Sequence, residues 1–134
     1  MGLDNGFYVR SRKRTLTRED LPSIIKYPWS ADFDDKFGIE IVYWRKYWGL
    51  RTEVCCSFNY DDYRIVFNTP EKVKDLIKII RSWMDPGRWE DEGNSIWSYD
   101  EARPNLEQSV INLTAICEFM KTNPDIYLEF YDSY

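Results

Sequence analysis

Hydrophobic side chains occupy every second position from Ile39 to Tyr43. A period of two predicts a β-strand, because successive side chains of a strand point to opposite faces of the sheet. Residues 48–58 and 63–68 are predicted to follow as a second and a third strand, with turns near residues 45–46 and 59–62. Three consecutive strands joined by short turns predict an antiparallel meander.

Shorter segments near both ends of the chain are predicted to extend this sheet. Residues 6–10 form a first strand in this interpretation, and residues 126–131 form a final one. Thr17 and Asp20 have the spacing of a helix capping pair, which predicts a short helix near residues 18–25.

Two further segments have helical periodicity. Thr69 can cap a helix, Pro70 suits its first position and Glu71 complements its dipole. This helix ends at the turn-forming residues 85–87. Its apolar positions are Val73, Leu76, Ile77, Ile80, Trp83 and Met84. A second helix is predicted over residues 104–122. Its apolar positions include Leu106, Val110, Leu113, Cys117 and Met120.

Together these elements predict an α+β fold in which two main helices pack on one face of a mostly antiparallel sheet. The length of 134 residues fits one globular domain over residues 1–134. No apolar run approaches the roughly 20 residues of a membrane helix, and the N-terminus has no apolar signal core. We therefore expect a cytoplasmic protein that is not inserted in a membrane.

The absence of histidine narrows the possible chemistry. Without histidine the chain cannot use Ser-His-Asp or Cys-His catalysis, nor a zinc site that contains histidine. Cys55 and Cys56 are adjacent and Cys117 is distant, so three cysteines cannot supply four zinc ligands. Their odd number is typical of reduced thiols. We expect a protein that is not an enzyme and that needs no metal or cofactor.

The alternative hypothesis that the protein is an enzyme depends on an acidic turn at residues 32–38. Lys36 and Phe37 occupy positions at which a calcium loop needs an oxygen ligand and a glycine, so a calcium site is not predicted. Asp34, Asp35 and Lys36 do have a spacing found in metal-dependent nucleases. A carboxylate- and metal-dependent nuclease or phosphotransferase therefore remains an alternative hypothesis.

The charge is distributed unevenly along the chain. The net charge is −5. Residues 1–30 contain six basic and three acidic side chains, a net charge of +3, whereas residues 85–101 contain six acidic side chains and only Arg88 as a base, a net charge of −5. A field of this sign repels nucleic acid and attracts a partner with a basic surface.

Aromatic residues make up 17% of the chain and are concentrated in two places. One is the predicted hairpin at residues 43–48, where either Trp44 or Tyr47 is exposed or a second layer covers them. The other is the predicted loop at residues 88–103, in which Trp and Tyr could anchor a partner or pin the loop to the core. The primary candidate binding residues are Asp85, Trp89, Glu90, Asp91, Glu92, Trp97, Tyr99, Asp100 and Glu101. The secondary candidates are Trp44, Arg45, Lys46 and Tyr47.

In its acidity, small size, α+β plan and acidic aromatic loop, the chain resembles bacterial toxin-immunity proteins. The resemblance concerns overall character and includes no family motif. It implies an antitoxin that binds and inhibits a basic toxin, for example a nuclease. A phage-encoded inhibitor of a host defence complex is an alternative within the same binding class. A nucleic-acid adaptor that uses Arg45, Lys46 and the basic N-terminal region is a further alternative.

Overall fold

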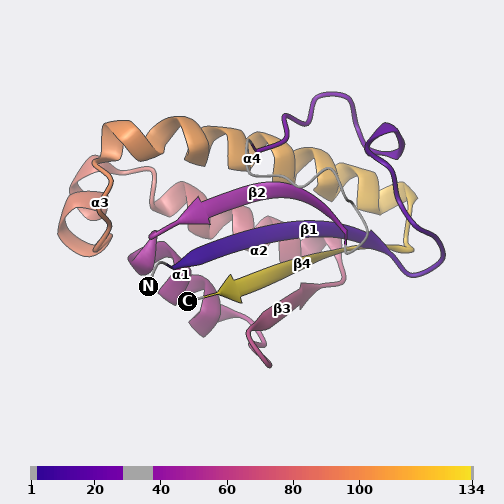
Figure 1. The fold of residues 1–134 in the computed structure, drawn as a ribbon, viewed down its shortest axis with the longest axis horizontal. Helices are drawn as coiled ribbons and strands as arrows, with labels where there is room; N and C mark the ends of the chain where they lie inside the picture. Colours follow the sequence, from indigo (N-terminus) through magenta and orange to yellow (C-terminus); the bar gives the residue numbers. More distant parts are fainter. Residues whose placement is uncertain (1–2, 29–37, 134) are drawn as a thin grey trace.

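The computed structural model describes residues 3–28 and 38–133, which form a four-stranded antiparallel sheet with helices on one face (Figure 1). The strands are β1 (Asp4–Ser11), β2 (Ile39–Arg45), β3 (Arg64–Phe67) and β4 (Ile126–Ser133). Their order across the sheet is β2-β1-β4-β3, so the first and last strands of the sequence lie side by side at its centre. The α+β prediction is therefore confirmed.

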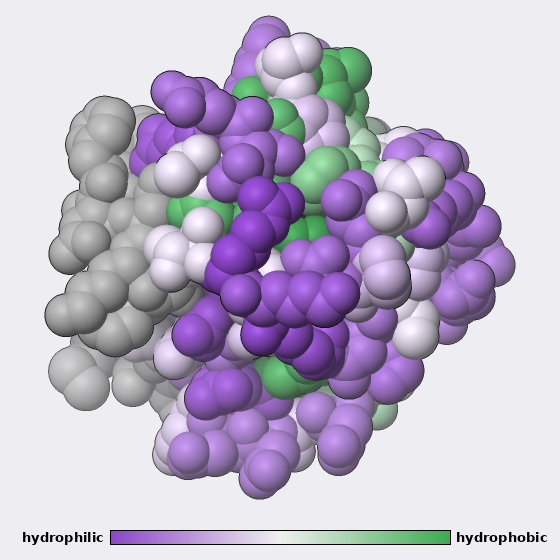
Figure 2. Space-filling view, turned by 90° about the vertical axis from the view of Figure 1, so that its right-hand side faces the viewer, coloured by the Kyte–Doolittle hydropathy of each residue, from purple (hydrophilic) through white to green (hydrophobic). Residues whose placement is uncertain are grey.

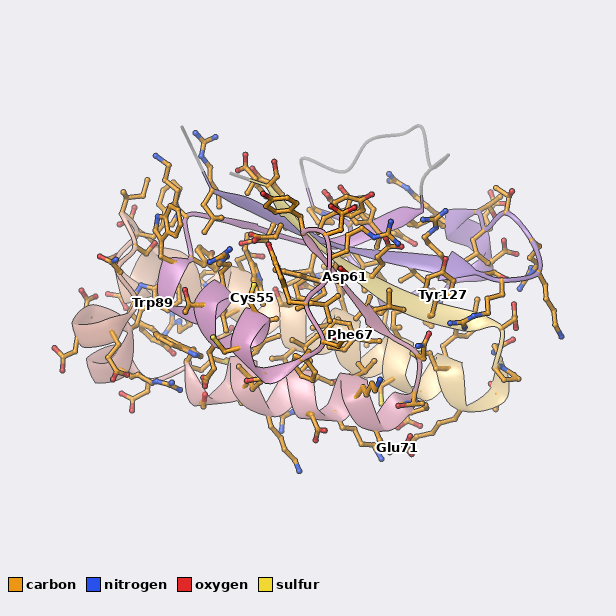
Figure 3. The ribbon with its side chains drawn as sticks, turned by 90° about the horizontal axis from the view of Figure 1, so that it is seen from below. Cys55, Asp61, Phe67, Glu71, Trp89 and Tyr127 are labelled. Atoms are coloured by element: carbon orange, nitrogen blue, oxygen red, sulfur yellow. The ribbon has the colours of Figure 1, made fainter. Side chains whose placement is uncertain are left out.

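Four α-helices and one short 3-10 helix accompany the sheet within the described residues. They are η1 (Arg18–Asp20), α1 (Trp48–Ser57), α2 (Pro70–Ser82), α3 (Pro86–Glu92) and α4 (Tyr99–Thr122). Seen along the plane of the sheet, α1, α2 and α4 lie on one side of it (Figure 3). The short helix α3 lies at one end of the molecule, beside the start of α4 (Figure 1).

The core lies between the sheet and these helices. Phe7 on β1 is fully buried and packs edge-on against Trp44, with ring centroids 4.9 Å apart. It also packs at a tilt against Phe130, with ring centroids 5.0 Å apart. Burying an aromatic or large aliphatic side chain stabilises a fold by roughly 1.5–3 kcal/mol. The long helix α4 covers the centre of the sheet and supplies many of the buried side chains.

Several sequence-based predictions are confirmed. Strands form at the expected places near residues 6–10, 39–44, 63–68 and 126–131. Thr69 caps α2, because its hydroxyl accepts a hydrogen bond from the backbone amide of Lys72 at 3.3 Å. These features depend on neighbouring residues, which the sequence displays directly.

The predicted strand at residues 48–58 is wrong, because this segment is helix α1. Lys46 has a positive φ of 60°, which turns the chain away from the sheet after β2. Leu50 and Val54 are both fully buried and lie four residues apart, on one face of the helix. The predicted meander is wrong as well, since β3 pairs with β4 and not with β2.

The predicted loop at residues 88–103 is also wrong. Asp85 caps α3, because its carboxylate accepts hydrogen bonds from the amides of Gly87 and Arg88 at 3.0 and 3.4 Å. Ser98 then caps α4 in a reciprocal pair with Glu101. Helix α2 thus ends at Ser82, before residues 85–87, which start α3, and Pro104 lies within α4 instead of at its start.

Candidate functional site

The two predicted aromatic clusters meet around one cavity of about 540 Å³. We call this cavity the aromatic pocket. Its described lining residues are Pro28, Tyr43, Arg45, Tyr47, Ile96, Trp97, Glu101 and Asn105. A volume of this size falls within the range of sites that hold a small molecule or a large side chain.

The residues that line the aromatic pocket come from separate elements. Tyr43 and Arg45 come from the end of β2, and Tyr47 follows immediately before α1. Trp97 belongs to the connection between α3 and α4. Its indole Nε1 donates a hydrogen bond to the carbonyl of Arg45 at 2.7 Å, which fixes the indole ring against the end of β2.

Asn105 organises the polar part of the aromatic pocket. Its Nδ2 donates to the carbonyl of Tyr43 at 2.8 Å and to the hydroxyl of Tyr47 at 3.1 Å. Only the NH₂ of an amide can donate to a carbonyl, so these contacts fix the orientation of the side chain. No described residue hydrogen-bonds to its Oδ1. The pocket therefore contains one unused acceptor.

The two tyrosines of the aromatic pocket stay protonated at neutral pH. Burial raises the pKa of Tyr47, and the hydrogen bond from Asn105 opposes this shift only in part. Burial, together with the hydrogen bond that its hydroxyl donates to Asp4 at 2.6 Å, raises the pKa of Tyr43 to about 12. Neither phenol can serve as a base near neutral pH, so these rings act as neutral walls.

Sequence reasoning found only part of this lining. Arg45, Tyr47, Trp97 and Glu101 were candidates, but Pro28, Tyr43, Ile96 and Asn105 were not. Asn105 lies one turn after Glu101 on α4, so both side chains project from the same side of that helix. A single asparagine in a helix carries no local signal of its role, because its partners are about 60 residues away in the sequence.

The structure corrects three of the predicted anchors, whose side chains are buried. Trp89 is only 2% exposed and packs edge-on against Tyr47, with ring centroids 5.0 Å apart. Its Nε1 donates to the carbonyl of Trp97 at 2.9 Å, so it pins the connection between α3 and α4 to the core. Trp44 and Tyr47 are buried as well, because α4 forms the second layer over them.

The predicted acidic residues separate into two groups. Four of the carboxylates accept hydrogen bonds within the fold: Asp85, Glu90, Glu92 and Glu101. The exposed carboxylates of Asp91 and Asp100 make no hydrogen bond or ion pair with any described residue. Asp91 and Asp100 are therefore the members of the set whose side chains can be changed with the least effect on folding.

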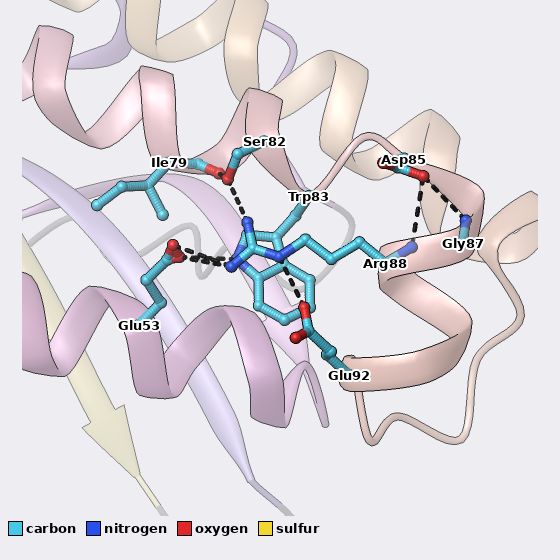
Figure 4. A network of polar contacts seen from close by, with 8 residues as sticks. All are labelled: Glu53, Ile79, Ser82, Trp83, Asp85, Gly87, Arg88 and Glu92. Atoms are coloured by element: carbon cyan, nitrogen blue, oxygen red, sulfur yellow. Dashed lines mark hydrogen bonds and ion pairs between the residues drawn. The ribbon is translucent and has the colours of Figure 1, made fainter.

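The Arg88 guanidinium holds α3 in place (Figure 4). Its Nη2 donates to both carboxylate oxygens of Glu53 on α1, at 3.0 and 3.2 Å, and its Nε donates to Glu92 at 3.0 Å. It also lies 4.0 Å from the ring centroid of Trp83 and donates to the hydroxyl of Ser82 at 2.6 Å. The acidic helix α3 is thereby attached to both α1 and the end of α2.

The remaining chemical candidates provide no metal centre among the described residues. No group of three or more Cys, Asp or Glu side chains there could hold a metal ion. The acidic turn with Asp34, Asp35 and Lys36 lies outside the described residues. All three cysteines are free thiols, and burial raises the pKa of Cys55 to about 11. Cys55 and Cys56 lie on α1 and not on a strand.

The fold is an α+β architecture with a four-stranded antiparallel sheet, helices on one face and the aromatic pocket at one end. Comparisons with protein-family models, with curated proteins and with solved structures found no match. None of the helices in the described part of the chain has both the length and the apolar character that crossing a membrane requires.

Proposed function

We propose that this protein is a non-catalytic binding module that uses its acidic end to bind and neutralise a basic protein partner, as a toxin-immunity protein does. One observation carries the proposal. The acidic residues of the 85–101 segment are gathered at α3 and the first turn of α4, and Trp97 and Glu101 of the same segment line the aromatic pocket.

The arrangement of charge supports a basic partner. The exposed basic residues Arg12, Lys13 and Arg14 lie at the opposite end of the molecule, beyond the end of β1 (Figure 1). Figure 2 views that end directly, and its surface is mainly hydrophilic. Charges separated by more than about 10 Å are largely screened at ordinary salt concentrations, so the two ends act on a partner independently. The acidic end then attracts and orients a cationic surface.

The test uses the free carboxylates and a matched control. Asp91→Lys with Asp100→Lys reverses two charges at the acidic end. Glu71→Lys with Asp75→Lys reverses two on α2, well away from Trp89 (Figure 3). Asp100 and Glu71 are both the second residue of their helix, and Asp91 and Asp75 are both the sixth. The two double variants therefore change the net charge by the same amount, and the changes at residues 100 and 71 affect the helix dipoles alike.

Each variant and the unchanged protein would be used to capture a partner from the native host, with affinity then measured on the purified pair. We expect the unchanged protein to capture a basic protein in stoichiometric amount. The variant at Asp91 and Asp100 should bind this partner at least tenfold more weakly, whereas the affinity of the control variant should change little. Equal binding by both variants contradicts the proposal. The identity of the captured protein distinguishes a toxin from a host defence complex.

A further inference from the structure

We propose that the aromatic pocket is the specificity site of this surface and that it receives an arginine side chain of the partner. This inference rests on the proposed function, because it assumes a basic protein partner, and it adds the chemical group that the pocket recognises.

The walls of the aromatic pocket suit a planar cation. Tyr43 on β2 and Trp97 between α3 and α4 contribute half-buried aromatic rings, and the Tyr47 ring, which is 4% exposed, adds little open surface. The hydrogen bond from Trp97 to the carbonyl of Arg45 fixes one of these rings before any ligand arrives. A guanidinium group stacks on aromatic faces and is less strongly hydrated than an ammonium group, which favours arginine over lysine in such a site.

The polar groups of the aromatic pocket favour a ligand that donates hydrogen bonds. Oδ1 of Asn105 has no partner among the described residues, and the amide orientation is fixed by the carbonyl of Tyr43. Glu101, one helical turn earlier, adds an exposed carboxylate to the lining. A guanidinium has five N–H donors and no acceptor, so it can bond both groups at once.

The charges around the aromatic pocket select against anionic ligands. Asp100 is adjacent to Glu101, and Glu90 accepts a hydrogen bond from the amide of Tyr99 at the same helix start. These carboxylates repel phosphates, so a nucleotide is disfavoured. Arg45 is the one basic side chain among the described lining residues, and its like charge weakens the attraction for a cation.

The test uses a defined probe, Nα-acetyl-L-arginine methylamide. The matching citrulline derivative has nearly the same shape but no charge. Binding is followed through the indole N–H resonance of Trp97, which Trp97→Phe identifies. For a ligand of this size we expect a dissociation constant on the order of a millimolar for the arginine probe. Binding of the citrulline probe should be at least about tenfold weaker, a difference of roughly 1.4 kcal/mol.

Two single substitutions should shift the affinity for the arginine probe in opposite directions. Glu101→Gln preserves the capping pair with Ser98, because glutamine can make the same hydrogen bonds at this position. It removes the negative charge, so we expect the arginine probe to bind about threefold more weakly. Arg45→Gln removes the like charge and should strengthen binding about twofold. Glu107→Gln on the same helix is outside the described pocket lining and serves as the unchanged control.

The inference is overturned if the Trp97 resonance does not move at tens of millimolar arginine probe, or if the citrulline probe binds equally well. Such a result leaves the proposed function standing when the Asp91 and Asp100 variant still loses its partner. If instead the arginine probe binds as expected and charge reversal leaves partner capture unchanged, the pocket assignment holds and the basic-partner proposal fails.

Discussion

Asp132 is a buried carboxylate near the end of β4, and it joins four segments that are distant in the sequence. Arg51 of α1 pairs with it through two hydrogen bonds of 3.1 and 2.5 Å. The hydroxyl of Tyr60 donates to it at 2.6 Å, and the amide of Asn5 donates at 2.8 Å. Burial raises the pKa of Asp132, but the hydrogen bonds from these three residues together outweigh burial and hold the pKa below its ordinary value.

Asp132→Asn should destabilise the protein at neutral pH, because it removes the buried carboxylate that pairs with the largely buried Arg51. Removing one partner of a buried pair costs about 3 kcal/mol of unfolding free energy. The folded-state pKa of Asp132 lies below the ordinary value, so its ionised form contributes stability above that value. The contribution is lost as the pH falls through the folded-state pKa. The difference in unfolding free energy between the unchanged protein and the Asp132→Asn variant should therefore narrow below about pH 4.

Urea unfolding over a series of pH values measures this gap. Asp62→Asn is the control, since Asp62 is exposed, and asparagine tolerates its positive φ of 52°. We expect that control to change stability by less than about 0.5 kcal/mol. A gap that stays constant down to the lowest pH would contradict the role given to the Asp132 charge. No local pattern in the sequence indicates this role, because Asp132 is one of 23 acidic residues and its partners are distant.

Helix α1 depends on the close approach of Gly49 to the end of α3. The amide of Gly49 donates to the carbonyl of Gly93 at 2.8 Å. A Cβ at residue 49 would lie 2.4 Å from the carbonyl oxygen of Glu92 and 2.6 Å from the Trp83 ring. No Cβ tolerates such a distance to backbone, so only glycine allows the first turn of α1 to reach α3.

Gly49→Ala should therefore lower the unfolding free energy by about 1–3 kcal/mol, the usual range for overpacking. Gly87→Ala is the matched control, because a Cβ there would meet only the Asp85 carboxylate at 3.5 Å. Removing a glycine at this helical position should be neutral or stabilise by up to about 1 kcal/mol. Thermal or urea unfolding of both variants compares them directly. Equal stability of the two variants would mean that α1 and α3 move apart without cost.

The attachment of the acidic end to the rest of the molecule depends on Arg88. Its guanidinium contacts α1 and the end of α2 as well as Glu92 of its own helix, and both it and Glu53 are partly buried. Lysine keeps the charge, but its single ammonium nitrogen cannot bond Glu53 and Glu92 from separate donors or stack in the same way on Trp83. Together with the buried Trp89 and the contact of Gly49 with Gly93, this side chain sets the position of α3 and so the placement of the acidic surface.

Arg88→Lys should loosen α3 while the sheet and α4 remain folded. Hydrogen bonds to charged groups contribute about 1.5–3 kcal/mol each, so we expect amide exchange in residues 86–92 to accelerate by at least tenfold. Exchange in β1 and β4 should change little. Arg103→Lys is the control, because its described contact is an exposed pair with Glu107 at 3.6 Å. Uniformly faster exchange across the whole molecule would contradict a local role for Arg88.

The sequence by itself determined the features that depend on neighbouring residues. It determined the cap of α2 at Thr69, the periodicity of β2, the α+β class and the absence of histidine chemistry. Tertiary structure alone decided that residues 48–57 are helical, that β3 pairs with β4, and that Trp44 and Trp89 are buried. It also brought Arg45, Tyr47, Trp97 and Glu101 to one pocket. The physical reason is the separation along the sequence of the residues that interact. Capping and periodicity act within one or two turns, whereas strand pairing and burial depend on contacts between distant segments.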